Sequence, residues 1–224
     1  MPQHEDWMQN YAESGLIDGQ DGFDTRLMRD LNDVGVHAYK VGHLARSGQT
    51  FPPAIPVYID WLNDLDARVP GEETRHRSTL RRSLIWALDD PAAKGNRAAS
   101  DAVLRQLART SPALEPFMQI QSAAILARIA SKDEFDRIVD LSRRPSLEDG
   151  ARVALVKYFG RYRRPESRDF ARAWLTRPIV RQEAVRTLGK IGTAEDIDAI
   201  ASYVDDEDPQ VRRAVESALK KLRS

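Results

Sequence analysis

No cysteine occurs in the 224 residues of the sequence. This absence excludes disulfide bridges, thiol nucleophiles, thiolate metal ligands and covalent haem attachment. Histidine is scarce as well: the four are His4, His37, His43 and His76, and no two are four residues apart, as a zinc-binding pair on one helix face requires. We therefore expect neither a metal site nor a cofactor.

The sequence also lacks long apolar runs and the glycine-rich signatures of common enzyme classes. No stretch approaches the ~18 apolar residues of a membrane-spanning helix. Residues 1–6 include two acidic residues and no Lys or Arg, unlike the basic start of a signal peptide. Phosphate-binding loops, dinucleotide fingerprints and nucleophile elbows are absent. These absences favour a non-catalytic, cytoplasmic protein that does not enter a membrane.

Charge is balanced overall, with 34 basic and 34 acidic residues, but it is unevenly distributed. Residues 1–66 carry a net charge of −7, residues 143–190 carry +8, and residues 191–224 carry −3. Such a gradient can orient an encounter with a charged partner, although solvated helix faces also differ in sign by chance. The basic segment favours a partner with an acidic surface.

A short pattern that ends in a basic and an apolar residue recurs four times: Ile125–Ile129, Tyr158–Tyr162, Thr187–Ile191 and Ala218–Leu222. Its basic residues are separated by 33, 29 and 31 positions. A period of this size corresponds to one helix pair of a stacked array. The sequence therefore predicts an all-α fold, an α-solenoid (α-α superhelix) of about five or six helix pairs.

Short turns that contain proline separate the predicted helices of the C-terminal half. The clearest precedes residues 209–222, where Asp208 suits the N-cap and Pro209 the first helical position. Upstream, the expected helices cover Phe23–Leu31, Val36–Leu44, Pro53–Leu65 and Glu73–Leu88. No long linker interrupts the chain, so we expect a single domain over residues 1–224. Within it, residues 1–22 are expected to form a mobile N-terminal helix and loop.

The segment Asp205–Arg212, followed by Ala214-Val215 and Ala218-Leu219, resembles a HEAT repeat. In that family a D-x-x-P-x-V-R turn joins two helices, and the second helix reads A-x-x-A-L-x-x-L. The resemblance is strongest over residues 147–224 and weakens upstream. Residues 31–57 are similar to N-terminal segments of bacterial HEAT-like proteins to which no activity is assigned.

The resemblance implies a HEAT-like α-solenoid that acts as a protein–protein interaction scaffold or adaptor. Two alternatives come with the same family. One branch resembles DNA alkylation-repair glycosylases, which implies nucleic-acid binding. Another branch acts on bilin chromophores, which implies an accessory factor for protein or chromophore modification. We expect a monomer that binds a protein partner, and we do not expect it to bind nucleic acid.

The recurring cations are the candidate partner-binding residues: Arg128, Arg161, Lys190 and Lys221, with Arg163 and Arg164 beside the second of them. Equivalent positions of a solenoid stack into a stripe, which would suit an acidic protein segment or a phosphate backbone. The alternative needs no partner, because a cation in the last turn of a helix offsets the helix dipole by ~0.3–1 kcal/mol. Arg163 and Arg164, next to Tyr162, are also the strongest argument for nucleic-acid binding.

A second recurring set, Arg152, Arg181 and Arg212, falls in the first turn of each second helix. A cation there opposes the helix dipole and needs compensation. In HEAT-like proteins this arginine usually bonds within or between repeats, so the resemblance implies a structural role. The family's acidic turn residue is present at Asp206 but is replaced at Leu175. A glycosylase-like site would require a Trp and an Asp in a basic cleft, for which only Trp174 and Asp169 are candidates.

Overall fold

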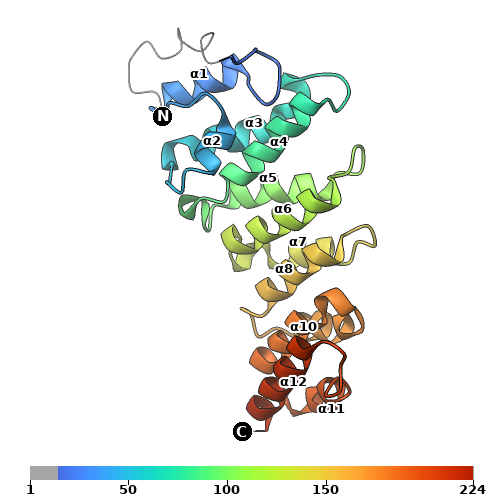
Figure 1. The fold of residues 1–224 in the computed structure, drawn as a ribbon. Coiled ribbons are helices and arrows are strands. Elements are labelled where there is room, and N and C mark those ends of the chain that lie inside the picture. The colour runs from blue at the N-terminus through green and yellow to red at the C-terminus, as the bar shows by residue number, and fades with distance from the viewer. Residues whose placement is uncertain (1–14, 224) are drawn as a thin grey trace. The chain divides into compact units, whose positions relative to one another are not determined.

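The computed structural model describes residues 15–223, which form twelve α-helices, several 3₁₀ turns and no β-strand (Figure 1). The helices are α1 (Thr25–Asp33), α2 (Val41–Ala45), α3 (Ile55–Arg68), α4 (Arg75–Ala87), α5 (Arg97–Ala108), α6 (Pro116–Ile129), α7 (Phe135–Ser142), α8 (Asp149–Phe159), α9 (Pro165–Ala173), α10 (Pro178–Ile191), α11 (Ile197–Ala201) and α12 (Pro209–Leu222). This number of helices agrees with the five or six helix pairs that the sequence predicts. The predicted helix within residues 1–14 lies outside the described residues.

Side-chain caps and prolines define where the helices begin. Asp24 accepts a hydrogen bond from the amide of Arg26 at the start of α1. Asp208 likewise caps α12 by accepting from the Gln210 amide at 2.7 Å, as the sequence predicts. Pro165 and Pro178 begin α9 and α10, where the missing N–H costs no intrahelical bond.

The chain divides into two compact units, and the division falls within α6. Unit 1 comprises residues 1–114 and 128–131. In unit 1, α3 packs against α1, α4 and α5, and α2 packs against α4. The core at these contacts contains Leu27, Leu31, Trp61 and Leu84, all buried.

Unit 2 comprises residues 115–127 and 132–224. Its second helices lie against one another, since α10 contacts both α8 and α12 (Figure 1). A connected aromatic core joins the first helices to α8: the ring of Phe159 lies 5.4 Å from Phe135 and 5.1 Å from Phe170, and Phe170 lies 5.2 Å from Trp174. Helix pairs stacked in this way confirm the predicted all-α, HEAT-like solenoid.

Helix α2 is shorter than the sequence pattern predicts. Residues 36–40 are not helical, and α2 begins only at Val41. The reason lies at Gly35, whose φ of +76° ends α1 in the left-handed region and directs the chain into an extended connection. The single-domain organisation stays a prediction.

The segment Gly15–Gly22 forms turns, as expected, and bonds to the helices beside it. Oδ1 of Asp18 accepts from the amide and the hydroxyl of Thr25 at 2.6 and 2.8 Å. The Gly22 amide donates to Nδ1 of His76 at 3.0 Å. His76 therefore ties this segment to α4.

Candidate partner-binding surface

The second helices α10 and α12 approach closely because Gly189 has no side chain at their crossing. A Cβ on Gly189 would lie 2.7 Å from Cβ and 2.9 Å from Cα of Ala218. Gly160 has a milder version of this contact, with Oγ1 of Thr187 at 3.1 Å from a Cβ added there. Small residues before the recurring cation thus permit close helix packing in unit 2.

An open groove of about 340 Å³ runs along the α10–α12 contact. Gly189, Ala214 and Ala218 contribute small residues to it. The longer side chains that line the groove are polar or basic: Gln182, Arg186, Gln210, Arg213, Ser217 and Lys221. None of the lining residues is acidic. The groove is therefore a region of positive potential that also offers amide and hydroxyl groups.

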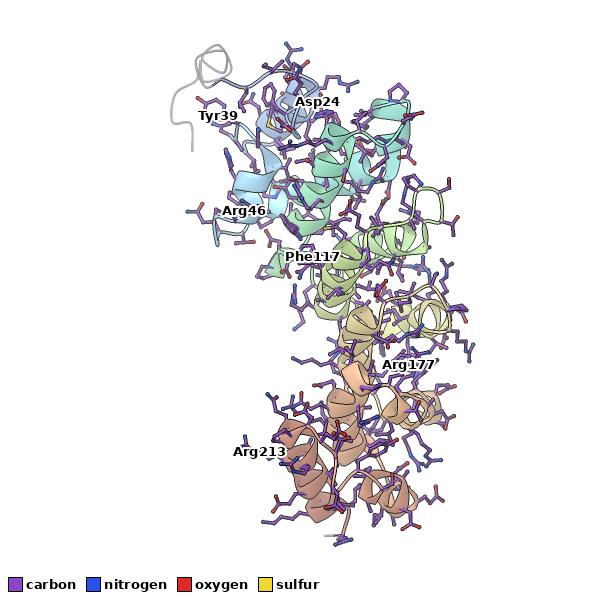
Figure 2. The ribbon with its side chains drawn as sticks, turned by 45° about the vertical axis from the view of Figure 1, so that its right-hand side comes forward. Asp24, Tyr39, Arg46, Phe117, Arg177 and Arg213 are labelled. Carbon is purple, nitrogen blue, oxygen red and sulfur yellow. The ribbon has the colours of Figure 1, made fainter. Side chains whose placement is uncertain are left out.

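Two cations of the groove, Arg186 and Arg213, differ in how far they are already paired. Arg186 forms an ion pair with Glu183 at 3.5 Å on its own helix. Arg213 is exposed and forms no hydrogen bond or ion pair with any residue that the structure describes, and Figure 2 shows it projecting outward from α12. Nε2 of Gln182 donates to Oε1 of Gln210 at 2.8 Å and links the two helices. A carboxylate that entered the groove would meet uncompensated positive charge.

Among the predicted cations, Lys221 lies in this groove and Lys190 is exposed on α10. Lys190 and Arg163 form no hydrogen bond or ion pair with residues in the described part of the chain. Unit 2 therefore presents several uncompensated cations: Arg163, Lys190 and Arg213. Of the six predicted partner-binding residues, only Lys221 lines the groove, where it lies with Arg186 and Arg213.

Arg161 and Arg164, on either side of Tyr162, bond within unit 2 instead. The guanidinium of Arg161 lies 4.6 Å from the Tyr158 ring centre, and its Nη2 donates to the carbonyl of Ala127 at 2.6 Å. Arg164 lies 4.2 Å from the ring centre of Phe135 and pairs with Asp136 at 3.3 Å. Such cation–π contacts hold the guanidinium groups against the aromatic core.

Tyr162 and Trp174 are also occupied by packing. The Tyr162 ring lies edge-on to Phe135, with 5.7 Å between ring centres, so it is not a free platform for a base. Trp174 is buried and packs against Phe170, and the guanidinium of Arg152 lies 5.6 Å from its ring centre. Trp174 therefore does not face a cleft with Asp169, as a glycosylase-like site would need.

Arg128 is placed apart from the other cations, in unit 1. Its Nε and Nη2 donate to the two carboxylate oxygens of Asp89 at 2.6 Å each, a bidentate pair. The charge of Arg128 is thus neutralised by Asp89, which follows α4.

The three first-turn arginines bond to carbonyl oxygens of the turn before their helix. Arg152 donates to the carbonyls of Ser142 and Arg144 at 2.5 and 2.6 Å. Arg181 donates to the carbonyl of Leu175 at 2.8 Å, and Arg212 donates to that of Asp206 at 2.7 Å. These carbonyl oxygens offset the repulsion between each guanidinium group and the positive end of the helix dipole.

Two acidic residues, the half-exposed Asp66 and the buried Asp196, are the centres of ion-pair clusters that the sequence patterns do not reveal. In unit 1, Asp66 accepts from Arg77, Arg81 and Arg109 at 2.5, 3.0 and 2.6 Å. Burial opposes its ionisation, but these three guanidinium groups outweigh that effect and lower the pKa of Asp66. The partners lie up to 43 residues apart, beyond the reach of any helical spacing rule.

Asp196 plays a similar role in unit 2. It accepts from the Thr193 amide at 2.8 Å, and Arg168 and Arg172 pair with it at 3.2 and 2.5 Å. Burial raises the pKa of this carboxyl group, but the hydrogen bonds from Thr193 and Arg172 outweigh burial and hold the pKa below its usual value.

The groove could be found only partly from the sequence. Arg186 and Arg213 lie outside the recurring motif, so the motif alone does not mark them as groove residues. Their common signal is the helical spacing from the motif: Arg186 precedes Lys190 by four residues, and Arg213 precedes Lys221 by eight. Both spacings place the pair on one face of its helix.

Residues 15–223 contain no helix long and apolar enough to cross a membrane. Over the same residues, no group of three or more His, Asp or Glu side chains is arranged to hold a metal ion.

Comparison with known proteins gives one match: the family model described as HEAT repeats matches residues 144–220. This match contains α8, α9, α10 and α11 and all but the last two residues of α12, and it includes every residue that lines the groove except Lys221. No curated protein and no solved structure matches the sequence significantly. HEAT repeats commonly mediate protein–protein interaction. The similarity of residues 31–57 to bacterial HEAT-like proteins stays a prediction.

Proposed function

We propose that this protein is a non-catalytic scaffold that binds an acidic segment of a protein partner in the α10–α12 groove. The observation that carries the proposal is the composition of that groove, which contains Arg186, Arg213 and Lys221 and no acidic residue. The HEAT-repeat match over residues 144–220 covers α10 and most of α12 and supports a role in protein binding.

The neighbouring amides favour a peptide as the ligand. Gln182 and Gln210 each keep donor and acceptor capacity beyond their mutual hydrogen bond, and Ser217 adds a hydroxyl. These groups can pair with the backbone of an extended segment, while Arg213 and Lys221 pair with its carboxylates. A phosphate backbone offers only acceptors, so it would leave the amide oxygens of Gln182 and Gln210 without a use.

A glutamate-rich peptide is the probe for this proposal, with a glutamine-rich peptide of equal length as its neutral counterpart. We expect the glutamate-rich peptide to bind and its affinity to fall as salt increases, because exposed charges are screened over about 8 Å at physiological ionic strength. The variant Lys221→Glu should weaken binding at least about tenfold, since it replaces an attraction with a repulsion.

Lys220→Glu is the matched control. Lys220 is exposed on the same turn of α12 and undergoes the same change of charge, but it does not line the groove. Equal losses for Lys220→Glu and Lys221→Glu would mean that net charge alone attracts the peptide, and would contradict the proposed site.

Nucleic acid is tested in the same titrations. If the cations follow a phosphate backbone, DNA or RNA should bind with log K falling by ~0.7–0.9 per phosphate neutralised as log salt rises. We expect little binding at about 150 mM salt, because the total charge of the chain is balanced and the groove offers only three cations to a phosphate backbone. Sub-micromolar binding of nucleic acid that is lost in Lys221→Glu would replace the scaffold proposal.

A further inference from the structure

Unit 1 contains a separate pocket of about 250 Å³, formed by the connection after α2, the start of α3 and the residues that follow α4. The aromatic residues Phe51, Tyr58 and Trp86 line it together with Asp89 and Asp90. No basic residue lines it. The charged residues that line this pocket are therefore acidic, whereas those that line the α10–α12 groove are basic.

The two acidic residues are not equivalent. Asp89 is neutralised by its bidentate pair with Arg128. Asp90 is buried and accepts hydrogen bonds only from neutral donors: the Thr50 hydroxyl at 2.5 Å and the amides of Phe51 and Ala92 at 2.7 Å each. No cation pairs with Asp90 among the residues that the structure describes, so a full negative charge remains beside the pocket. A carboxylate offers about four acceptor positions, of which three are used.

Tyr58 provides a second, independent indication of a missing ligand. The residue is 1% exposed, and its hydroxyl has no hydrogen-bond partner within residues 15–223. Tyr58 lines the pocket together with Asp90. Burial, and after it the charge of Asp90, raises the pKa of the Tyr58 hydroxyl and keeps it neutral. Since buried hydroxyl groups normally have a partner, an unsatisfied one in the wall of a pocket points to a ligand that supplies it.

Besides Arg128, which neutralises Asp89, two cations lie against the aromatic side of the pocket. The guanidinium groups of Arg46 and Arg82 lie 5.5 and 5.4 Å from the ring centre of Trp86, and neither lines the pocket. Figure 2 shows Arg46 at the periphery of unit 1. The Trp86 ring therefore already has cations against it, and the unmatched negative charge lies at the Asp90 end.

We propose that this pocket binds the side chain of a lysine from a partner protein, with its ammonium group at Asp90 and Tyr58 and its methylene chain against Phe51 and Trp86. An ammonium is compact and carries three donors, which suit the remaining acceptor position of Asp90 and the Tyr58 oxygen. A planar guanidinium needs a broader set of acceptors than this end provides. The site is separate from the α10–α12 groove and does not depend on the function proposed for it.

Three small probes test the chemistry on the full chain: Nα-acetyl-lysine methylamide, its neutral norleucine counterpart, and butylammonium. Such small molecules bind in the millimolar range at best, so NMR chemical shifts are the suitable measurement. We expect the lysine probe to bind and to shift the methyl resonances of Leu44, Ala45 and Ala87, which line the pocket. The methyl groups of Val211 and Val215 in α12 should not shift.

The variant Tyr58→Phe keeps the ring and removes the hydroxyl, and should weaken binding of the lysine probe about three- to tenfold. Tyr203→Phe, in unit 2, is the control and should leave binding unchanged. The methyl shifts of the unaltered protein locate the site even if Tyr58→Phe fails to fold.

Several results would overturn the proposal. Equal binding of the norleucine probe would mean that the pocket accepts any aliphatic chain. Tighter binding of butylammonium than of the lysine probe would assign the pocket to a free amine instead of a protein side chain. Absence of binding by all three probes, or unchanged binding in Tyr58→Phe, would also reject it.

Discussion

Arg181 in α10 pairs with Asp206 of the following helix pair, with 2.6 Å between Nη1 and Oδ2. The same arginine bonds to the Leu175 carbonyl of its own pair, so one side chain joins two neighbouring repeats. Asp206 in turn accepts from the Asp208 amide at 2.9 Å. This single residue pair is therefore a joint between repeats in unit 2.

The first prediction concerns that joint. Asp206→Ala should lower the free energy of unfolding by about 1–3 kcal/mol, because it leaves the partly buried Arg181 without its charged partner. Urea unfolding followed by circular dichroism measures the change. Asp205→Ala, at the exposed neighbouring position, should stay within about 0.5 kcal/mol of the unaltered protein. Equal effects of the two substitutions would show that the pair adds nothing.

The second prediction concerns the closest helix contact. Gly189→Ala should destabilise the protein by about 1–3 kcal/mol, because the new methyl group would overlap Ala218 at the backbone as well as the side chain. Gly160→Ala meets only the Thr187 side chain and should cost much less, since alanine also favours helix. Thermal unfolding of both variants measures the difference, and a reversed order would contradict the packing described for α10 and α12.

The third prediction concerns the core of α10. Leu188 is 0% exposed, and Leu188→Ala should cost about 2–5 kcal/mol through the cavity it leaves. Val204 is 52% exposed, so Val204→Ala serves as the control and should have little effect. Hydrogen exchange should show the loss of protection mainly in the neighbouring helices, because repeats couple to their neighbours. Unchanged thermal stability in Leu188→Ala would contradict this burial.

The fourth prediction concerns acid. The pKa of Asp196 is lowered in the folded state, so its contribution to stability is present above the unfolded-state pKa of about 3.9 and is lost as pH falls through the folded value. Unfolding by urea at a series of acidic pH values should therefore show falling stability below about pH 4. Asp196→Asn should be less stable at neutral pH and should show a flatter dependence in that acidic range. A parallel dependence in both proteins would assign the acid sensitivity to other carboxylates.

The architecture was accessible from the sequence because it depends on local and periodic signals. The spacing of the recurring motif predicted the helix pairs, and Asp208 with Pro209 predicted the start of α12. Where local signals compete, the prediction was less accurate: the apolar residues of 36–44 follow a helical period, but the positive φ of Gly35 and an extended Lys40 restrict α2 to its second half.

The surface was harder to predict, because the role of a cation depends on what lies next to it in space. Arg128 and Lys221 occupy equivalent positions of the motif, but Arg128 is paired with Asp89, 39 residues upstream, and Lys221 lines a groove. Likewise, nothing in the sequence around Tyr58 indicates that its hydroxyl lies buried near Asp90. Such relationships arise from contacts between helix pairs, and residue spacing within one helix does not encode them.

The carbonyl bonds of Arg152, Arg181 and Arg212 have a consequence for how this chain can vary. Every residue carries a carbonyl oxygen, so the turn that satisfies each arginine needs a certain backbone path but no particular side chains. Ser142, Leu175 and Glu207 supply the oxygen equally well although their side chains share no chemistry. Turns are therefore free to acquire new surface residues, and new partners, while the arginine that follows them stays fixed.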